Sequence, residues 1–416
     1  MDRLPLALVG CGPMGRRHIR ALGTLRRAGL DAPDLVAVCD LDPAIAARAA
    51  DEAEAQTGRR PRIVRSLDDL LADDGVRAID IATDPAGHHR LAVPALLAGR
   101  HVLCEKPLSI TMRGCRAILD AHDAAPSGTV LATQEQHRRG PANRIARAVI
   151  ASGMIGAVHL VRTTVIGGDD RIILTPWRHL REKGTIALDN GVHFADVHRY
   201  LVGSPWRETW GHGLIAEPVR RKGPVTFEPE LYGAAMANAP DEIVATGEDS
   251  VIALTRHEND VRTMITWLPS GRGPQYHERT VHGRLGSIVV PPDRTGRDLV
   301  VRLDGRSLGA HDLLRELPAG TLDEVTERLF GDPVHPERPF GEIDAAHLAA
   351  SIHDFARSIR EGSSPEIDGR EGADAVAAIL GAIEAGRLGR AVTREEMLAL
   401  RVTAAHDDID RAIGLA

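Results

Sequence analysis

Short apolar runs alternate with longer amphipathic stretches over the first 135 residues. The apolar runs predict strands at residues 4–9, 35–39, 62–64, 78–82, 101–104 and 129–132. The stretches between them carry apolar residues at helical spacing and predict helices at residues 16–28, 44–56, 67–72, 88–98 and 111–122. Strands that alternate with helices of this length are typical of right-handed crossovers and a parallel sheet. We therefore predict an α/β fold with a doubly wound parallel sheet.

The pattern changes after Pro141, where strands begin to follow one another without helices between them. Strands are predicted at residues 158–166, 250–257, 261–268, 287–290 and 299–303, and helices at 141–152, 189–201, 345–361 and 372–387. Residues 214–245 and 304–342 are rich in Pro and Gly, and we interpret both as insertions. We expect a first domain at residues 1–134 and an α+β second domain at 135–416 with a large mixed or antiparallel sheet. The C-terminal helices are expected to pack back on the first domain.

Composition supports two structural units and excludes some partners. The chain of 416 residues is 43% hydrophobic and 26% charged, the balance of an ordinary globular protein, and holds no apolar run long enough to span a membrane. Its formal charge of −7 argues against nucleic acid or an anionic membrane as a partner. All aromatic residues lie at or after Trp177, so the first domain must build its core from Ala, Val, Leu and Ile.

Four cysteines occur in the chain, at Cys11, Cys39, Cys104 and Cys115. They are too few for a disulfide framework, and no C-x-x-C pair suggests zinc. We predict free thiols in a reducing compartment. The first apolar strand begins at residue 4 with no leader pattern before it, so we expect a cytoplasmic protein.

A glycine-rich turn follows the first strand and opens the first helix. Residues 10–15 read G-C-G-P-M-G, with Gly10, Gly12 and Gly15 at the G-x-G-x-x-G positions and Pro13 and Met14 between them. Such glycines let the backbone approach a pyrophosphate, which binds at the helix N-terminus where the free amides favour anions. The turn therefore predicts a dinucleotide-binding site, and the fold is that of a Rossmann domain.

An acidic residue, Asp40, ends the second strand. A carboxylate there can accept hydrogen bonds from the ribose hydroxyls of the cofactor and would repel a 2′-phosphate. The alternative role, a cap for the next helix, suits Asp42 better because Pro43 follows it directly. We therefore predict NAD as the cofactor, with NADP less suitable.

Several further motifs resemble one family of oxidoreductases. Residues 97–107 read L-A-G-R-H-V-L-C-E-K-P, and the lysine of E-K-P stands at the carboxyl end of a predicted strand, where ligands bind in such sheets. The other matching segments are I-A-T at 81–83 followed by His88, W-R at 177–178, L-D-N-G-V-H at 188–193, and F-A-R-S-I at 355–359 followed by Pro365 and Gly369. With the glycine turn, these motifs make the chain resemble the glucose-fructose oxidoreductase / inositol dehydrogenase (Gfo/Idh/MocA) family over nearly its whole length.

Three departures from the family pattern are visible. The proline of I-A-T-P is displaced to Pro85, and the usual triple glycine before the D-x-G-x-H motif is reduced to K-G-T at 183–185. Residues 214–245 have no obvious counterpart in the family. The last two departures concern the substrate pocket, so the resemblance leaves the substrate's identity open.

The resemblance implies an NAD-dependent oxidoreductase that acts on a secondary alcohol or ketone of a sugar, cyclitol or sugar derivative. It implies a catalytic group of Lys106, Asp189 and His193. Cofactor contacts are implied for Gly10, Gly12, Pro13, Met14, Gly15, Asp40, Thr83, His88, Glu105 and Lys106, and substrate contacts for Lys106, Trp177, Arg178, Asp189 and His193. The resemblance also implies a homodimer or homotetramer, and a cis peptide bond between Lys106 and Pro107.

Physical chemistry agrees with the catalytic assignment. Asp189 and His193 are four residues apart, so they project from one face of a helix. A histidine can take the proton of an alcohol as hydride leaves its carbon, and the Lys106 ammonium can stabilise the developing alkoxide. Taken alone, the helix pair could be a surface pair and the lysine a solvated one. Likewise Trp177 could belong to the core rather than to a substrate pocket.

Two neighbouring groups of polar residues invite other interpretations. Asp196 shares a helix face with Asp189 and His193, but His198 turns away and no known ligand motif is present, so we predict no metal site. A polar run after the sixth predicted strand favours a place at the cleft, although charged runs are usually solvated; it consists of Gln134, Gln136, His137, Arg138 and Arg139.

Two rival functions share the fold that we predict. One is an NAD-dependent, redox-neutral glycosidase that works through transient oxidation, and the other is a regulator that binds a dinucleotide without catalysis. The presence together of Lys106, Asp189 and His193 argues against the regulator. Analysis of the products separates the glycosidase from the dehydrogenase.

Overall fold

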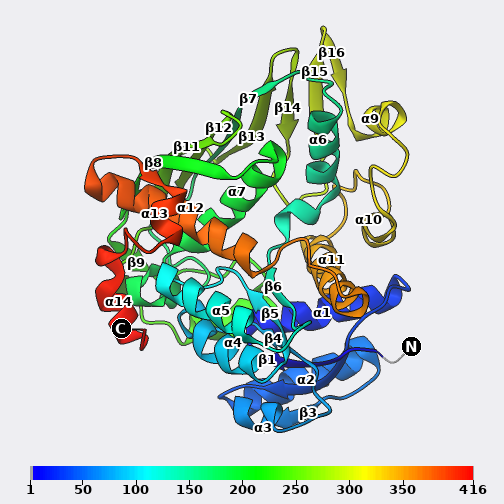
Figure 1. The fold of residues 1–416 in the computed structure, drawn as a ribbon, viewed down its shortest axis with the longest axis vertical. Helices are drawn as coiled ribbons and strands as arrows, with labels where there is room; N and C mark the ends of the chain where they lie inside the picture. Colours follow the sequence, from blue (N-terminus) through cyan, green and yellow to red (C-terminus); the bar gives the residue numbers. More distant parts are fainter. Residues whose placement is uncertain (1–2, 416) are drawn as a thin grey trace. The chain divides into compact units, whose positions relative to one another are not determined.

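The structure of the chain is a computed structural model that describes residues 3–415. The chain forms two compact units, and Figure 1 traces its path through them. The first unit contains the described residues up to Gln136, residues 344–373 and residues 413–415. The second unit contains residues 137–343 and 374–412. The chain therefore leaves the first unit and returns to it twice.

The first unit is built on a parallel sheet, which confirms the predicted doubly wound α/β fold. Its strand order is β3-β2-β1-β4-β5-β6, and every neighbouring pair runs parallel. The strands are β1 (Pro5–Val9), β2 (Asp34–Cys39), β3 (Arg62–Val64), β4 (Ala78–Ile81), β5 (His101–Glu105) and β6 (Leu131–Gln134). The helices between them are α1 (Pro13–Arg27), α2 (Pro43–Thr57), α3 (Leu67–Leu71), α4 (His88–Leu97) and α5 (Met112–Ala124). Helix α1 packs beside α2, and α4 beside α5.

Local sequence explains where these helices start. The Asp42 carboxylate accepts hydrogen bonds from the first amides of α2, so Asp42 is the cap that its place before Pro43 predicts. The Thr111 hydroxyl caps α5 in the same way. Apart from the edge strand β3, the strands are largely buried aliphatic runs, with Leu6 and Ile79 fully buried, because both faces of a doubly wound sheet are covered. The four cysteines are buried free thiols, as predicted.

Late segments of the chain complete the first unit. Most of α11 (Phe340–Glu361) belongs to it, and Asp344 in that helix forms a buried ion pair with Arg17 of α1, with 2.8 Å between Nε and Oδ2. The Thr133 amide donates to the Ile367 carbonyl at 2.9 Å, so residues 367–368 run along β6. The Ile413 carbonyl lies 3.0 Å from Nε2 of His89.

The second unit is built on a nine-stranded mixed sheet within the described chain, which confirms the predicted α+β class. The strand order is β16-β15-β14-β13-β7-β12-β11-β8-β17; β7 and β12 run parallel and the other pairs are antiparallel. The strands are β7 (Val158–Ile166), β8 (Trp206–Leu214), β11 (Ser250–His257), β12 (Arg262–Leu268), β13 (Tyr276–Gly283), β14 (Gly286–Val290), β15 (Val300–Leu303), β16 (Arg306–Leu308) and β17 (Val392–Thr393). The sequence pattern missed four strands of this sheet, β8, β13, β16 and β17.

Helices cover one face of this sheet. The core joins Ile145 and Val149 of α6 (Pro141–Ala151) and Leu201 of α7 (Ile186–Val202) to Val161 and Val281 of the sheet. Helix α7 begins three residues earlier than the predicted residue 189, because the Thr185 hydroxyl caps it by accepting from the Leu188 amide. It follows that two of the residues expected to be catalytic, Asp189 and His193, lie in the first two turns of this helix.

The two segments interpreted as insertions have regular structure in the second unit. Residues 214–245 contain β9 (Val219–Arg221), α8 (Pro229–Ala237) and β10 (Glu242–Val244), and the two strands pair in a small separate sheet. Arg220 on β9 pairs with Asp249 at 2.6 Å, and both side chains are fully buried. Residues 304–342 contain β16, α9 (Ala310–Glu316), α10 (Glu324–Phe330) and the start of α11. The chain ends with α12 (Gly369–Leu388), β17, α13 (Arg394–Leu398) and α14 (Asp407–Ala412).

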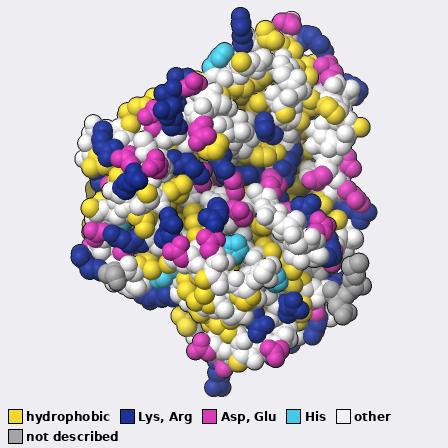
Figure 2. Space-filling view, viewed as in Figure 1, with side chains coloured by type: hydrophobic (Ala, Val, Ile, Leu, Met, Phe, Trp, Pro, Cys, Tyr) yellow, Lys and Arg dark blue, Asp and Glu magenta, His cyan; other side chains and the backbone are white. Residues whose placement is uncertain are grey.

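Helix composition and surface charge can be described for the residues that the structure places. Over residues 3–415, no helix is both long enough and apolar enough to cross a membrane. On the face seen in Figure 2, basic side chains lie among acidic ones rather than gathering into one basic area.

Candidate active site

The glycine turn joins β1 to α1 at the carboxyl edge of the parallel sheet. Gly10 has a φ of +92°, and a Cβ atom there would lie 2.6 Å from the Ala82 carbonyl oxygen. A Cβ atom on Gly15 would lie 2.0 Å from the Gly10 oxygen, so both positions require glycine for the fold itself. Around Gly12, by contrast, a Cβ atom would have no neighbour within 4 Å. The turn thus leaves space at Gly12, where the free amides of the helix start would face an anion.

The residues between and beside these glycines support the same geometry. Pro13 occupies the first position of α1, where a missing amide costs nothing. The Met14 sulfur lies 3.4 Å from Nη1 of Arg17, whose guanidinium is held by Asp344. Helix α1 is therefore fixed from its first turn.

Asp40 follows β2 beside the glycine turn. One carboxylate oxygen accepts from the Cys11 amide at 2.7 Å and the other from the Asp42 amide at 2.9 Å. These bonds fix the carboxylate next to the turn without using all of its acceptor positions, since a carboxylate can accept about four hydrogen bonds. The side chain remains suited to bind ribose hydroxyls.

Two further residues expected to bind the cofactor follow β4. Thr83 comes two residues after the strand, and His88 begins α4. The His88 ring is fully buried, with Nδ1 3.0 Å from the Pro107 carbonyl oxygen and Nε2 3.3 Å from the Thr83 carbonyl oxygen. His88 therefore ties the end of β4 to the turn after β5. Burial lowers its pKa.

A buried ionic triad supports the end of β5. His18 of α1 lies between two carboxylates, with Nδ1 2.8 Å from Asp80 and Nε2 2.9 Å from Glu105. Burial alone would lower the pKa of His18, but the charges and hydrogen bonds of Asp80 and Glu105 raise it to about 10. The imidazole is therefore charged at neutral pH, and it holds Glu105 in place.

Lys106 follows Glu105 directly. Its amide donates to the Glu105 carboxylate at 3.0 Å, so the triad reaches the backbone of this lysine. The Lys106–Pro107 peptide bond is cis, as the family resemblance implied. In the sheet order, Asp40, the glycine turn, Thr83 and Lys106 follow β2, β1, β4 and β5, so they lie in sequence along one sheet edge.

Asp189 lies in the first turn of α7 in the second unit. Its Oδ2 accepts from Nε of Arg178 at 2.8 Å, and both side chains are nearly buried. The Arg178 guanidinium lies 4.2 Å from the centre of the Trp177 ring, and its Nη1 donates to the Thr175 hydroxyl at 2.6 Å. The structure thus brings Trp177, Arg178 and Asp189 together, three residues that the sequence assigned to the substrate pocket or the catalytic group.

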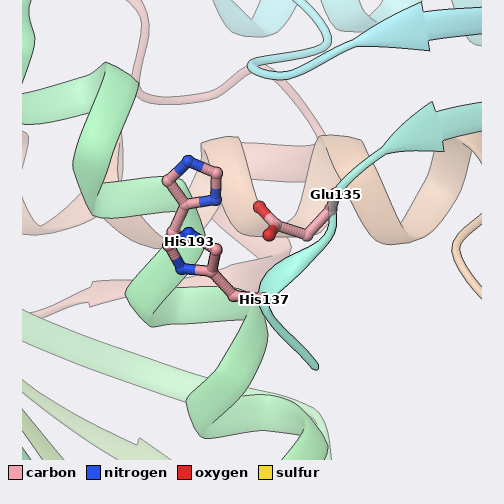
Figure 3. Close-up of side chains that lie close together, drawn as sticks. All are labelled: Glu135, His137 and His193. Carbon is pink, nitrogen blue, oxygen red and sulfur yellow. The ribbon is translucent and has the colours of Figure 1, made fainter. Parts of the chain in front are cut away.

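His193 lies one turn further along α7 and is buried. Its ring stacks on that of His137, with 3.9 Å between the centroids and 14° between the planes (Figure 3). Glu135, also labelled there, belongs to the first unit and accepts a hydrogen bond from the Gln136 amide at 2.8 Å.

Other polar residues of α7 and of the run after β6 have separate partners. Asp196 forms a buried bidentate ion pair with Arg138. Nε2 of His198 lies 2.8 Å from the Thr163 hydroxyl. Asp196 and His198 are therefore each engaged by the structural framework of the second unit.

Sequence reasoning gave no role to His18, and it did not single out His137 within its polar run. The partners of His18 lie 62 and 87 residues away in sequence, so no local pattern links them. The position of His137 just after β6 was the one available signal, because ligands bind beyond the carboxyl ends of strands in such sheets.

Taken together, a doubly wound sheet with a glycine turn beside its point of strand-order reversal defines a dinucleotide-binding protein. Two sequence models of a single family match this chain. Residues 4–130 match the oxidoreductase family with an NAD-binding Rossmann fold (GFO_IDH_MocA), and residues 143–289 match the GFO/IDH/MocA C-terminal domain. The chain belongs to the Gfo/Idh/MocA family of NAD-binding oxidoreductases, which confirms the resemblance and the predicted cofactor.

Curated relatives extend over much of the chain. Levoglucosan dehydrogenase of Pseudarthrobacter phenanthrenivorans is 27% identical over 392 residues, which cover 88% of this chain and 91% of that protein. Inositol 2-dehydrogenase of Acidothermus cellulolyticus is 29% identical over 232 residues, 56% of this chain and 62% of that protein. The relatives are named as dehydrogenases of sugars or polyols, and this chain is an enzyme of the same oxidoreductase class.

Solved structures share the fold. An oxidoreductase domain protein from Kribbella flavida has a TM-score of 0.74 at 22% identity, covering 94% of this chain and 99% of that chain. Levoglucosan dehydrogenase in complex with NADH and levoglucosan has a TM-score of 0.71 at 22% identity with the same coverage. At this identity the likeness shows a common architecture for both units.

Proposed function

We propose that this enzyme reversibly oxidises a secondary alcohol of a sugar, cyclitol or sugar derivative, with NAD as the hydride acceptor. The observation that carries the proposal is the arrangement on α7, where Asp189 and His193 lie buried on successive turns. The family supports the cofactor, and the relatives named for levoglucosan and inositol support the class of substrate.

We assign the general base to His193. A neutral imidazole accepts the hydroxyl proton as the C–H bond donates hydride to the nicotinamide ring, so the alcohol becomes a ketone. Lys106 is assigned to the reacting oxygen, where an ammonium hydrogen bond stabilises negative charge as it develops. Asp189 is assigned to the same group, and its ion pair with Arg178 fixes the position of its carboxylate.

The same geometry supports a substrate-binding role for Trp177 and Arg178. The indole ring offers an apolar face of the kind that packs on sugar rings, and the stacked guanidinium keeps donors that Asp189 and Thr175 do not use. We infer that these two side chains, with Asp189, select the orientation of the sugar.

On the cofactor side, we assign NAD binding to the glycine turn, Asp40, Thr83 and the Glu105–Lys106 segment. His88, whose buried ring lies against the Thr83 and Pro107 carbonyls, is assigned to holding Thr83 in place rather than to direct contact. NAD supplies the hydride-accepting nicotinamide when it is bound. The open space at Gly12 and the anchored carboxylate of Asp40 are the features that suit a pyrophosphate and an unphosphorylated ribose. The preference for NAD over NADP follows from the charge of Asp40.

The proposal is tested with levoglucosan, inositol and D-apiose as substrates, the compounds for which relatives are named, by following NADH absorbance. Replacement of the base in His193→Ala is expected to reduce turnover roughly 10²- to 10⁴-fold. His159→Ala, the same change at an exposed position on β7, is the matched control and should leave turnover unchanged. A His193→Ala enzyme with near-wild-type turnover would show that another residue takes the proton. Release of sugar from glycosides without net NADH would instead favour the glycosidase function.

We also propose that the chain self-associates through the outer face of the sheet in the second unit. Trp210, Ile252, Leu254 and Met264 are 42%, 47%, 40% and 36% exposed, and they stand on neighbouring strands with Leu254 opposite both Trp210 and Met264. Adjacent exposed apolar side chains of this kind mark interaction surfaces. Sedimentation should give a dimer or tetramer, and Leu254→Glu should give a smaller species. A monomeric wild-type chain would refute this assignment.

A further inference from the structure

His137 is a buried histidine that the proposed reaction does not use. It opens the single turn that follows β6, residues His137–Arg139, and its side chain is 7% exposed. Its ring lies nearly parallel to that of His193, 3.9 Å away between centroids (Figure 3). A buried aromatic ring in this position limits the rotation of its neighbour, because turning the second ring would force the two to overlap.

Two neighbours, Asn143 and Asp293, contact His137 in the second unit. Asn143 donates through its Nδ2 both to the His137 carbonyl at 2.9 Å and to the Asp293 carboxylate at 2.8 Å. The other Asp293 oxygen lies 3.3 Å from Nδ1 of His137. The fully buried Arg279 guanidinium donates two hydrogen bonds to the Asp293 carboxylate, at 2.9 and 2.8 Å. Asn143 therefore holds the backbone of His137, and the ring lies beside a carboxylate that Arg279 fixes.

His137 is uncharged at neutral pH, which suits a residue that positions a base without exchanging protons itself. Burial, together with charge on the adjacent His193, lowers the pKa of His137 to about 3, against the opposing effect of Asp293. Although burial would raise the pKa of Asp293, the Arg279 guanidinium holds it well below its usual value. At neutral pH, His137 thus presents an uncharged aromatic face to His193 and does not compete with it for a proton.

We propose that His137 is a positioning residue, whose anchored ring holds the His193 imidazole in the orientation needed for proton transfer. The inference rests on the proposed role of His193 as the base. His137 itself gains and loses no proton in the reaction.

Two substitutions separate the stack from the contact with Asp293. His137→Phe keeps a ring of similar size but loses the ring nitrogen, whereas His137→Gln keeps an N–H donor but loses the ring. If the stack positions His193, His137→Gln should lower kcat by up to about 100-fold, the range expected when a reacting group is misplaced by about 1 Å. KM for levoglucosan or inositol and the Kd for NADH should change less than threefold, and His137→Phe should restore kcat to within about threefold of wild type.

A double-mutant cycle tests whether His137 acts through His193. In the His193→Ala background, His137→Gln should cost no further turnover, because the residue that it positions is gone. His257→Ala is the control for the loss of a buried imidazole in the same unit, since that ring contacts Ser204 and Thr263 and burial lowers its pKa. The control should lower stability without lowering the kcat of the folded enzyme.

The possible results distinguish this inference from the function on which it rests. If His137→Phe and His137→Gln lower kcat equally, the stack has no positioning role. The same conclusion follows if His137→Gln lowers kcat in the His193→Ala background by the same factor as in the wild type. If His193→Ala keeps wild-type turnover, the base assignment itself is wrong and the inference falls with it. If His193→Ala is inactive while His137→Gln is fully active, only the inference is refuted.

Discussion

The open space at Gly12 allows cofactor binding to be weakened without unfolding the first unit. A Cβ atom at this position meets no heavy atom within 4 Å, and the backbone angles of φ −67° and ψ −163° are accessible to alanine. We therefore expect Gly12→Ala to change the free energy of unfolding by no more than about 0.5–1 kcal/mol. Alanine is a poorer N-cap residue than glycine, which lowers stability, but it also reduces the conformational entropy of the unfolded chain, which raises stability.

The effect on NAD binding should be much larger. The added methyl group would keep the backbone amides at the start of α1 from close approach to the pyrophosphate. Hydrogen bonds to charged groups contribute about 1.5–3 kcal/mol each, so the loss of one contact corresponds to roughly 10- to 100-fold weaker binding. The predicted result is a raised Kd for NADH in an enzyme of nearly unchanged stability.

The measurement pairs calorimetric titration with NADH and urea unfolding of the same samples. Gly233→Ala in α8 is the matched control, since a Cβ atom there also meets nothing within 4 Å and the site belongs to the other unit. It should leave the Kd unchanged. A Gly12→Ala Kd within twofold of wild type would mean that the pyrophosphate does not approach this glycine, and a large fall in stability would contradict the open space.

Three other predictions follow from the first unit. Gly15→Ala places a Cβ atom 2.0 Å from the Gly10 carbonyl oxygen, so its urea midpoint should fall by the equivalent of about 1–3 kcal/mol, and an unchanged midpoint would contradict the close approach. Asp40→Ser should narrow the preference for NAD in parallel titrations with NADP, and tighter binding of NADP by the wild type would refute the role of Asp40. Because the pKa of His18 rises from 6.5 to about 10 on folding, the folded chain keeps a proton that the unfolded chain releases between these values. The free energy of unfolding should therefore fall as pH rises from 6.5 to 9, by up to about 1.4 kcal/mol per pH unit, and the slope should flatten in His18→Asn.

Much of the first unit could be predicted because local and global signals agree there. Each strand is a short aliphatic run, and each helix carries its own start signal, such as Asp42 before Pro43. The glycine turn combines a motif with the strand and helix that the motif requires. Asp40 and Lys106 could be placed on one sheet edge because the carboxyl ends of parallel strands share that edge.

In the second unit, the local sequence pattern did not predict every strand. Strand β8 contains Gly211 and Gly213, and glycine is disfavoured inside strands. Helix α12 packs closely on both, since a Cβ atom on Gly211 would lie 2.7 Å from that of Ala382 and one on Gly213 would lie 3.0 Å from Ile383. These contacts join residues about 170 positions apart, so no local pattern contains them.

The candidate site divides in the same way. Asp189 and His193 could be predicted from their helical spacing and the resemblance. The ion pair of Asp189 with Arg178 and the stack of His193 on His137 could not, because they depend on how α7 packs against separate segments of the second unit. Arg178 and His137 both lie outside α7, so no helical spacing links either of them to its partner.

The return of the chain to its first unit has a consequence for its synthesis on the ribosome. Arg17 pairs with Asp344, and Thr133 pairs with Ile367. Both partners are synthesised only after residues 137–343 of the second unit, so neither contact can form before then. At about 5–20 residues per second, the roughly 200 intervening residues take on the order of 10–40 s. During that time the nascent dinucleotide-binding sheet has an unpaired edge at β6 and a buried arginine without its carboxylate. An N-terminal fragment ending at Gln136 should therefore aggregate or require a chaperone, although it contains every strand of its sheet.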